Sequence, residues 1–443
     1  MYRETIAKVF RQILLLGLFY SQSALSLEVL SLQAQAELVD RITHERLTEV
    51  LPSLMRREGV DLWVIMSREY NEDPILKTLL PATWMSARRH TMLVVHDPGE
   101  GAALEYLAVA RYPVGKVFAP AWNVAEQPDQ WRALEELITA RAPETIAVNH
   151  SDNFALADGM SSTEYRKLQE ALPATMRARL VSAERLAIAW LETRSKTEMA
   201  YYPQLVQTGH QLIARAFSSE VITPGVTTTD DVSWWLRERS QALGLGNWFH
   251  PSVSYQRNGE EGFNLQGTIL PGDLIHVDFG LTWLRLNTDQ QQHAYVLKPG
   301  ESEVPRGLLE ALVAGNQLQD ILTANFKLGL TGNEVLSRSR KQALARGINP
   351  LIYSHPLGLH GHGAGPTIGM WDAQQGVPVK GDYPLFPDTA YSIELSATSA
   401  VAEWGGDVRI MLEEDAFFDG EIVDYMDGRQ TAFHLIPSSE VKP

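Results

Sequence analysis

Two aspartates in the C-terminal half of the chain occupy positions where a negative charge is costly. Asp278 falls inside the apolar run 274–279, and Asp289 follows eleven residues later. A buried carboxylate is unfavourable unless it is paired or bound to a metal. If the chain turns back through 280–286, the two side chains can face each other across neighbouring strands, with Cβ atoms about 5 Å apart. Two carboxylates that close repel unless a cation neutralises them or one is protonated. The alternative is one solvated and one hydrogen-bonded aspartate.

Three histidines follow in a glycine-rich segment, at His355, His360 and His362. Glycine lets the backbone bring imidazole rings close to a ligand, and neutral imidazole is a common metal ligand. A flexible surface loop with incidental histidines is the alternative interpretation.

Further carboxylates occur in or after apolar runs nearer the C-terminus. Glu394 lies within 391–395, and Glu413 and Glu414 follow a second apolar run. Each glutamate alone is weak evidence, because most glutamates are exposed or ion-paired. Together with the two aspartates and His355, they predict a cluster of four carboxylates and one imidazole.

Such a cluster has a defined metal chemistry. A set dominated by oxygen atoms with one imidazole suits Mn, Co, Zn or Fe. Two bridging carboxylates further predict two metal ions about 3.5–4 Å apart. We therefore predict two divalent metal ions as cofactors, with Mn as the first choice and Co, Zn or Fe as alternatives.

The elements that must position these residues follow from the periodicity of apolar residues. Long helical patterns and short apolar runs alternate in residues 190–437, which predicts helices packed over an antiparallel sheet, an α+β domain. Thr228, with Asp231 three residues later, predicts a capped helix start. The expected strands cover 274–279, 295–297, 390–395 and 408–418, and the expected helices cover 196–220, 229–243, 305–327 and 333–346.

Residues 38–188 are expected to form a separate α/β domain, because strand-like runs alternate there with helical patterns. Pro52 is expected to kink or divide the first helix. The expected strands are 62–66, 91–95, 107–110 and 145–149, and the expected helices are 38–57 and 162–171.

Composition excludes several classes of protein. The net charge of −16 argues against a nucleic-acid partner, which requires clustered Lys and Arg. The chain has no cysteine, which excludes disulfides, thiolate metal sites and a cysteine nucleophile.

The first residues have the layout of a secretory signal peptide. Basic residues precede the apolar run 13–20, and small residues follow up to Ser26. The run is too short for a membrane span, which needs about 20 apolar residues; an uncleaved N-terminal anchor is the alternative. We predict that residues 1–26 are removed and that the protein is periplasmic or secreted, with no stable membrane anchor.

The order and spacing of the site residues resemble the pita-bread metallopeptidases, the family of methionine aminopeptidase, aminopeptidase P and prolidase. That family binds two metals through Asp, Asp, His, Glu and Glu in this order, and a catalytic histidine follows its ligand histidine as His362 follows His355. The resemblance implies a pita-bread catalytic domain preceded by a creatinase-like α/β domain. It also implies these metal ligands, with Glu414 as the alternative to the last: Asp278, Asp289, His355, Glu394 and Glu413.

The resemblance further implies hydrolysis of short peptides in the manner of Xaa-Pro aminopeptidase or Xaa-Pro dipeptidase. Glu394 would hold metal and accept a proton from the attacking water, and His362 would donate a hydrogen bond to the developing oxyanion. Trp371 and Trp404 could shape the substrate pocket, or could be ordinary core or rim aromatics. The expected partner is a short peptide or another small molecule, and a homodimer is left open.

The chain departs from the family pattern around the site. The segment 258–263 has no histidine where the family carries a substrate-binding one, and Leu351 replaces a histidine of the proline-specific branch. Residues 290–293 replace a Thr-Arg element. Two alternatives therefore stay open: a non-peptidase enzyme of this fold, such as a metal-dependent lyase or C–N hydrolase, and a non-catalytic metal-binding module.

Overall fold

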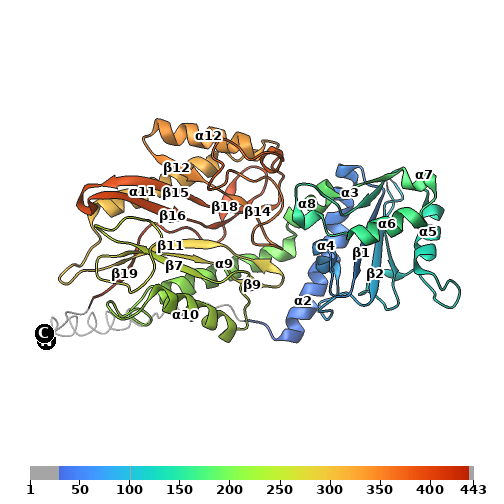
Figure 1. Ribbon diagram of the computed structural model, residues 1–443, viewed down its shortest axis with the longest axis horizontal. Coiled ribbons are helices and arrows are strands. Elements are labelled where there is room, and N and C mark those ends of the chain that lie inside the picture. The colour runs from blue at the N-terminus through green and yellow to red at the C-terminus, as the bar shows by residue number, and fades with distance from the viewer. Residues whose placement is uncertain (1–28, 100, 439–443) are drawn as a thin grey trace, which may run out of the picture.

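The computed structural model describes residues 29–99 and 101–438, so the expected signal peptide at 1–26 lies outside the described residues. Two parts lie side by side in Figure 1, the N-terminal part at the right and the C-terminal part at the left. The expected domain limits, 38–188 and 190–437, stay predictions of where the chain divides.

A mixed six-stranded sheet with the order β4-β3-β2-β1-β5-β6 forms the centre of the N-terminal part. Strand β1, in the middle of this sheet, is buried on both faces, which explains why the sequence from 62 to 66 is continuously apolar. The strands are β1 (Leu62–Arg68), β2 (His90–His96), β3 (Glu105–Val109), β4 (Ala119–Pro120), β5 (Ile146–Val148) and β6 (Leu180–Ser182). The helices are α2 (Leu32–Glu45), α3 (Leu51–Glu58), α4 (Pro74–Leu79), α5 (Gln130–Arg141), α6 (Ser162–Ala171), α7 (Ala174–Arg177) and α8 (Glu184–Glu192). The four strands expected from the sequence are β1, β2, β3 and β5.

The first long helix widens before Pro52. A π-helical turn, Arg46–Val50, joins α2 to α3, and Pro52 occupies the first turn of α3. Proline donates no backbone hydrogen bond and its ring clashes with the carbonyl four residues earlier, so a wider turn accommodates it. The expected division of the helix near Pro52 is thus the π-helical turn that separates α2 from α3.

The C-terminal part contains three larger sheets and a short hairpin. The first sheet has the order β19-β11-β8-β7, the second β12-β15-β16 and the third β13-β14-β17-β18, while β9 pairs with β10. The strands are β7 (Ser252–Gln256), β8 (Leu274–Phe279), β9 (Thr282–Trp283), β10 (Leu286–Asn287), β11 (Gln290–Val296), β12 (Asn349–Ile352), β13 (His355–Leu357), β14 (Thr389–Ser392), β15 (Leu395–Val401), β16 (Gly406–Leu412), β17 (Asp415–Phe418), β18 (Val423–Tyr425) and β19 (His434–Ile436). The helices are α9 (Lys196–Ala216), α10 (Thr229–Ala242), α11 (Arg306–Ala324) and α12 (Gly332–Ala345).

Helices cover the outer faces of these sheets. Helices α9 and α10 pack against the sheet of β7, β8 and β11, and α11 and α12 pack against the sheet of β12, β15 and β16. Figure 1 shows the strands between α10 below and α12 above. A bridge between Gln291 and Glu413 joins the two sheets in the middle. The expected α+β arrangement is confirmed, and Thr228 caps α10 through a capping box with Asp231.

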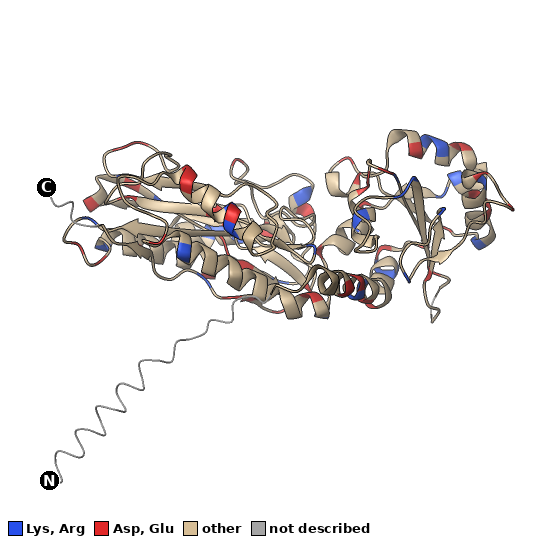
Figure 2. Cartoon of the chain, turned by 90° about the horizontal axis from the view of Figure 1, so that it is seen from below, with Lys and Arg blue, Asp and Glu red and all other residues tan. Residues whose placement is uncertain are grey.

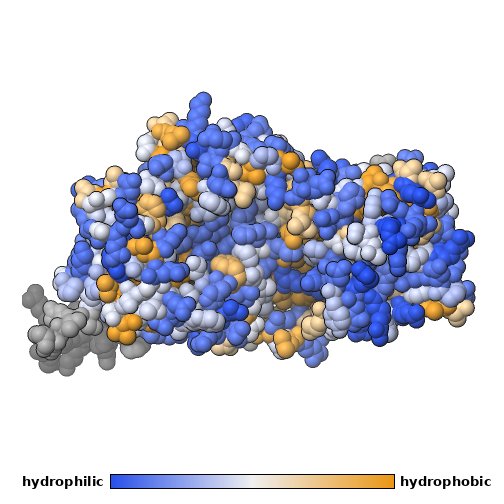
Figure 3. Space-filling view, viewed as in Figure 1, coloured by the Kyte–Doolittle hydropathy of each residue, from blue (hydrophilic) through white to orange (hydrophobic). Residues whose placement is uncertain are grey.

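Acidic and basic residues are interspersed in Figure 2. The face of the molecule seen in the space-filling view of Figure 3 is mostly polar. Among the residues that the structure describes, no helix is both long and apolar enough to cross a membrane.

Candidate metal centre

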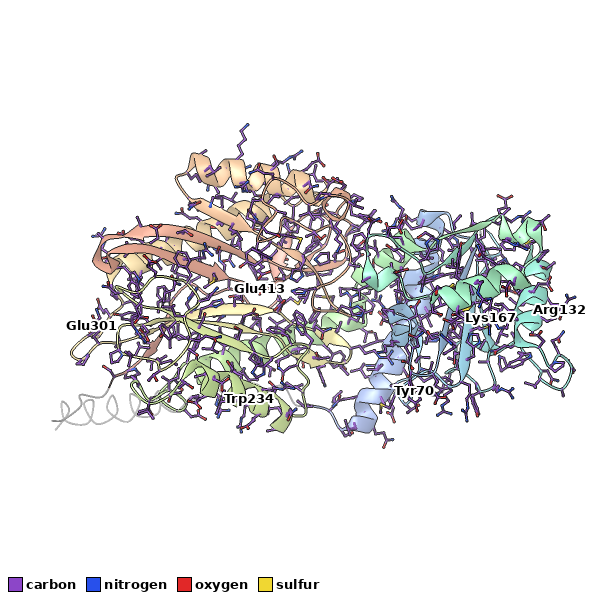
Figure 4. All side chains as sticks on the ribbon, in the orientation of Figure 1. Tyr70, Arg132, Lys167, Trp234, Glu301 and Glu413 are labelled. Atoms are coloured by element: carbon purple, nitrogen blue, oxygen red, sulfur yellow. The ribbon has the colours of Figure 1, made fainter. Side chains whose placement is uncertain are left out.

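Five side chains expected from the sequence converge between the sheets of the C-terminal part. Asp278 lies near the end of β8 and Asp289 directly before β11, while His355 begins β13. Glu394 lies between β14 and β15, and Glu413 lies between β16 and β17. Figure 4 labels Glu413 in the middle of this part, well inside the helices.

The two aspartates are diagonal neighbours rather than opposed residues, so the expected direct pairing is wrong. In the ladder of β8 and β11, Asp278 faces Gln291, which places Asp289 two residues along. The intervening chain forms the β9–β10 hairpin, which turns at Leu284 and Arg285 with positive φ. Ligand oxygens of both aspartates still lie within 4.8 Å of each other and of one from Glu413.

His355 presents an unpaired nitrogen to the carboxylates. Its Nδ1 lies 2.9 Å from the Pro356 carbonyl oxygen and donates to it, which leaves Nε2 with a lone pair. That Nε2 is 3.8 Å from oxygens of Asp289 and Glu394 and 3.9 Å from one of Glu413. These distances are too long for hydrogen bonds but suit ligands that share a cation, each about 2 Å from it.

Two buried atoms of the cluster have no hydrogen-bond partner among the described residues. They are His355 Nε2 and Asp278 Oδ1. A buried polar atom without a partner loses its hydrogen bonds to water and gains none within the protein, so such atoms are rare in folded proteins. A cation between these ligands would satisfy both.

The described side chains form three groups that could hold a cation. His355, Glu394 and Glu413 form one group, and Asp278, Asp289 and Glu413 form a second that shares Glu413 with it. The third group consists of Asp289, His355 and His362. Carboxylate oxygens with one imidazole are donors that Mn, Co, Zn and Fe accept. The residues therefore fit divalent cations.

Burial shapes the charge of the cluster. It raises the pKa of Asp278, Asp289 and Glu394 well above the usual range, and the charge of Glu413 raises each further. Burial also raises the pKa of Glu413 to about 7, although hydrogen bonds from Ser392 and Gln291 oppose that shift. Burial therefore favours the protonated forms of these carboxyl groups, and a divalent ion would favour the ionised forms.

Burial acts on His355 in the direction that favours metal binding. It lowers the pKa of His355 to about 4, with a smaller effect from neighbouring His362. The imidazole is therefore neutral at physiological pH, which is the form that binds metals.

Solved structures of peptidases share the architecture of nearly the whole chain. The X-Pro aminopeptidase of Thermotoga maritima MSB8 matches with a TM-score of 0.61 at 16% identity, covering 86% of this chain and 99% of the other. The Xaa-Pro dipeptidase of Bacillus anthracis has a TM-score of 0.58 at 16% identity, with 91% of this chain and 100% of the other covered. A variant of Escherichia coli aminopeptidase P has a TM-score of 0.55 at 12% identity, with 90% and 95% covered.

The chain has the pita-bread fold. The shared region includes the N-terminal part, so the expected fold class is confirmed for both parts. A scan against protein-family models and a search of curated proteins find no match.

Hydrogen bonds distinguish which of the two adjacent glutamates, Glu413 or Glu414, faces the cluster. Glu413 accepts hydrogen bonds from Ser392 and Gln291 inside it. Glu414 points elsewhere, since its carboxylate oxygen lies 2.6 Å from His210 Nε2. Glu413, and not the alternative Glu414, belongs to the site.

A pocket of about 400 Å³ opens onto the cluster from the side of the N-terminal part. Its walls include Phe154, Tyr353, His362, Trp371, Lys380 and Glu394. Trp371 is 71% exposed at this wall, whereas Trp404 packs in the core with β15 and β16 and lines no part of the pocket. Of the two alternatives for Trp404, the ordinary core aromatic is confirmed and the pocket residue is wrong.

His362 stands at the entrance to the cluster. Its ring makes edge contacts with His355 at 4.9 Å and with Trp248 at 5.0 Å between ring centroids. Burial lowers its pKa, so it is a neutral hydrogen-bond donor. His360, the third histidine of the segment, is outside the groups that could hold a cation.

Sequence reasoning missed the polar side chains that bond to the carboxylates. Gln291 and Ser392 both donate to Glu413, and Tyr353 lines the pocket with a phenol whose pKa burial raises. As a sequence pattern, the run of three glutamines is a departure from the family. Its position shortly before the apolar residues 294–297 is the signal that points to Gln291, because amides in a strand that enters the core must be hydrogen-bonded.

Proposed function

We propose that this protein is a metal-dependent peptidase that hydrolyses short peptides, in the manner of Xaa-Pro aminopeptidases and Xaa-Pro dipeptidases. The observation that carries the proposal is the buried cluster with an unpaired His355 Nε2 that opens onto a pocket. Solved peptidases with the same fold support it. The substrate is a short peptide that enters the pocket.

The proposed cofactors are two divalent cations, with manganese as first choice and cobalt, zinc or iron as alternatives. His355, Glu394 and Glu413 would hold one, and Asp278, Asp289 and Glu413 would hold the other. When bound, such ions make a water more acidic and polarise the scissile carbonyl.

Glu394 is the proposed proton acceptor. Its Oε1 accepts a hydrogen bond from Gln291, and its Oε2 faces His355 at the floor of the pocket. A buried carboxylate takes a proton readily because burial favours its neutral form. It can then pass that proton to the leaving amine.

His362 is the proposed oxyanion donor. The neutral imidazole at the pocket wall offers an N–H to the oxygen that becomes negative as the carbonyl is attacked. A fixed donor of this kind stabilises the transition state more than the ground state.

The test begins with elemental analysis of protein purified without added metal, followed by assays of Xaa-Pro and Xaa-Ala peptides on the same sample. We expect divalent metal and preferential release of the residue before proline. Glu394→Gln should abolish turnover, while Glu303→Gln at an exposed position serves as the control. Bound metal without cleavage of any peptide would overturn the proposal, and an alkene product formed without water would favour a lyase.

We also propose that the protein is exported and is periplasmic or secreted. The basic start, short apolar run and small residues of 1–26 support this. The check is N-terminal sequencing after expression in a bacterial host. A chain that keeps Met1 and stays in the cytoplasm would contradict it.

A further inference from the structure

Gln291 lies among the carboxylates of the candidate metal centre and bonds to two of them at once. Its Nε2 is 2.5 Å from Glu394 Oε1 and 2.6 Å from Glu413 Oε2. Its Oε1 is 2.9 Å from His276 Nε2. All three polar contacts of the amide are thus formed with buried partners or, for Glu394, with one at the floor of the pocket.

The directions of these hydrogen bonds are fixed by chemistry. An amide donates only from nitrogen and accepts only at oxygen, so both hydrogens of Gln291 go to the glutamates. The oxygen of Gln291 must then accept, so His276 Nε2 carries the hydrogen between them. If the amide were flipped, its oxygen would face two carboxylate oxygens, and His276 would meet an N–H group. The two glutamates therefore fix the orientation of Gln291, and His276, as the tautomer with hydrogen on Nε2, completes it by donating to the amide oxygen.

On each glutamate the amide engages the oxygen that does not face His355, and Glu413 Oε1, which does face His355, also accepts a hydrogen bond from Ser392. Gln291 engages Glu394 Oε1 and Glu413 Oε2, whereas Glu394 Oε2 and Glu413 Oε1 are the oxygens near His355 Nε2, at 3.8 and 3.9 Å. One oxygen of each carboxylate thus accepts a hydrogen bond from Gln291, and the other points toward His355.

A neutral donor suits this position. A lysine or arginine between the two glutamates would supply a full positive charge and take the place of a cation. An amide supplies only hydrogen bonds, so it orients the carboxylates and leaves their net charge for an external ion.

We propose that His276 and Gln291 form a positioning pair that aims one oxygen of Glu394 and one of Glu413 at the cation subsite of His355. The inference rests on the proposed function for the presence of a cation, but not for the reaction that the cation serves. Partners that orient metal ligands typically change metal affinity by about 10–100-fold when they are removed.

The test is titration of metal-free protein with Co²⁺, followed by calorimetry and by the visible absorption bands that report the geometry around cobalt. Gln291→Met keeps the length of the side chain and removes both donors. We expect it to weaken Co²⁺ binding by about 10–100-fold and to shift the absorption bands. Gln292→Met is the matched control, because the neighbouring glutamine contacts Glu414 and His434 instead. It should leave affinity and spectrum unchanged.

Two substitutions of His276 test the second half of the pair. His276→Phe removes the donor and should weaken Co²⁺ binding in the same direction, by less than Gln291→Met. His276→Gln restores an N–H and should recover part of the affinity and the original bands, which a purely structural role would not require. Circular dichroism checks that each variant is folded, and the His276 variants decide the matter if Gln291→Met is not.

Several outcomes would overturn the inference. Equal affinities and spectra for Gln291→Met and Gln292→Met would do so, as would His276→Gln behaving like His276→Phe. A wild-type protein that binds no Co²⁺ would overturn both this inference and the proposed function. A wild-type protein that binds Co²⁺ in the expected way but cleaves no peptide would overturn only the proposed function.

Discussion

Two clusters of carboxylates, each with a histidine, lie next to one another where the chain passes from β16 to β17, and they treat their histidines in opposite ways. In the first, Glu413 lies near His355, whose pKa burial lowers to about 4. In the second, His210 lies between Glu414 at 2.6 Å and Asp427 at 2.9 Å. Burial opposes the charge of His210, but hydrogen bonds to these carboxylates outweigh it and raise its pKa to about 10.

This difference separates a structural cluster from a binding cluster. His210 is itself the cation of its cluster, so its charges are compensated within the protein. His355 is neutral and its Nε2 is unpaired within the described residues, so the carboxylates around it lack a positive partner. The adjacent residues Glu413 and Glu414 therefore belong to clusters with different roles, and substitution of each one tests its role separately.

The largest expected effect on activity comes from replacing Glu413 and Glu414 by glutamine, one at a time. Glu413→Gln should abolish binding of at least one metal ion and lower peptidase activity by ~1,000-fold, since bound metal supplies several kcal/mol of transition-state stabilisation. Glu414→Gln should keep the metal content and lose stability instead. Metal analysis and steady-state kinetics measure both, and similar metal loss in the two variants would remove the distinction.

The next effect concerns a histidine beside the first cluster that is not assigned as a ligand. His362→Phe should lower kcat by about 100–1,000-fold, the effect of removing one oxyanion donor, and should leave metal content unchanged. His250→Phe, at an exposed histidine whose ring makes a tilted contact with Trp234, is the control. Loss of metal in His362→Phe would assign this residue to the ligands.

The second cluster is tested through stability. His210→Gln removes the cation between two carboxylates and should destabilise the protein by about 3 kcal/mol, measured by urea unfolding near pH 6. The folded pKa of about 10 lies above the ordinary value of 6.5, so this contribution is complete below pH 6.5 and is lost as pH rises toward 10. The gap between wild type and variant should therefore shrink over that range. A constant gap would show that His210 acts by packing alone.

The smallest expected effect is a pH dependence of the metal-free protein. The pKa of Glu413 is raised from 4.5 to about 7, so the folded state holds a proton that the unfolded state has released. Stability should fall as pH rises through that window, which lowers the melting temperature by a few degrees between about pH 5 and 7.5. Added Mn²⁺ should reverse the fall. A metal-free protein that melts at a higher temperature at pH 7.5 would contradict this assignment.

Part of this site could be predicted from the sequence, because a buried charge appears as a carboxylate within an otherwise apolar run. Asp278 stands out as a carboxylate in an apolar strand, and β8 has the bounds that the apolar run predicts. The sequence pattern does not distinguish Glu413 from Glu414 as the residue that faces the cluster. The chain leaves one sheet and joins another between β16 and β17, so strand alternation does not fix where either side chain points.

Other features leave no pattern in a single sequence. The role of Gln291 depends on Glu394 and Glu413, more than 100 residues away along the chain. The expected strand at 390–395 is interrupted at Glu394, and β13 is only three residues long, because tertiary packing decides these breaks. Helices with strong caps, such as α6 and α10, were predictable because capping is local.

The hairpin between the two aspartates ties the metal centre to the rest of the molecule. Arg285 at its turn donates hydrogen bonds to the backbone carbonyls of Thr78 and Leu80, at the end of α4 in the N-terminal part. The short covalent path from Asp278 to Asp289 is thus clamped at its midpoint by a distant portion of the chain. A fragment without the N-terminal part would lack these two hydrogen bonds, so we expect the spacing of the two aspartates to be less constrained in it than in the whole chain.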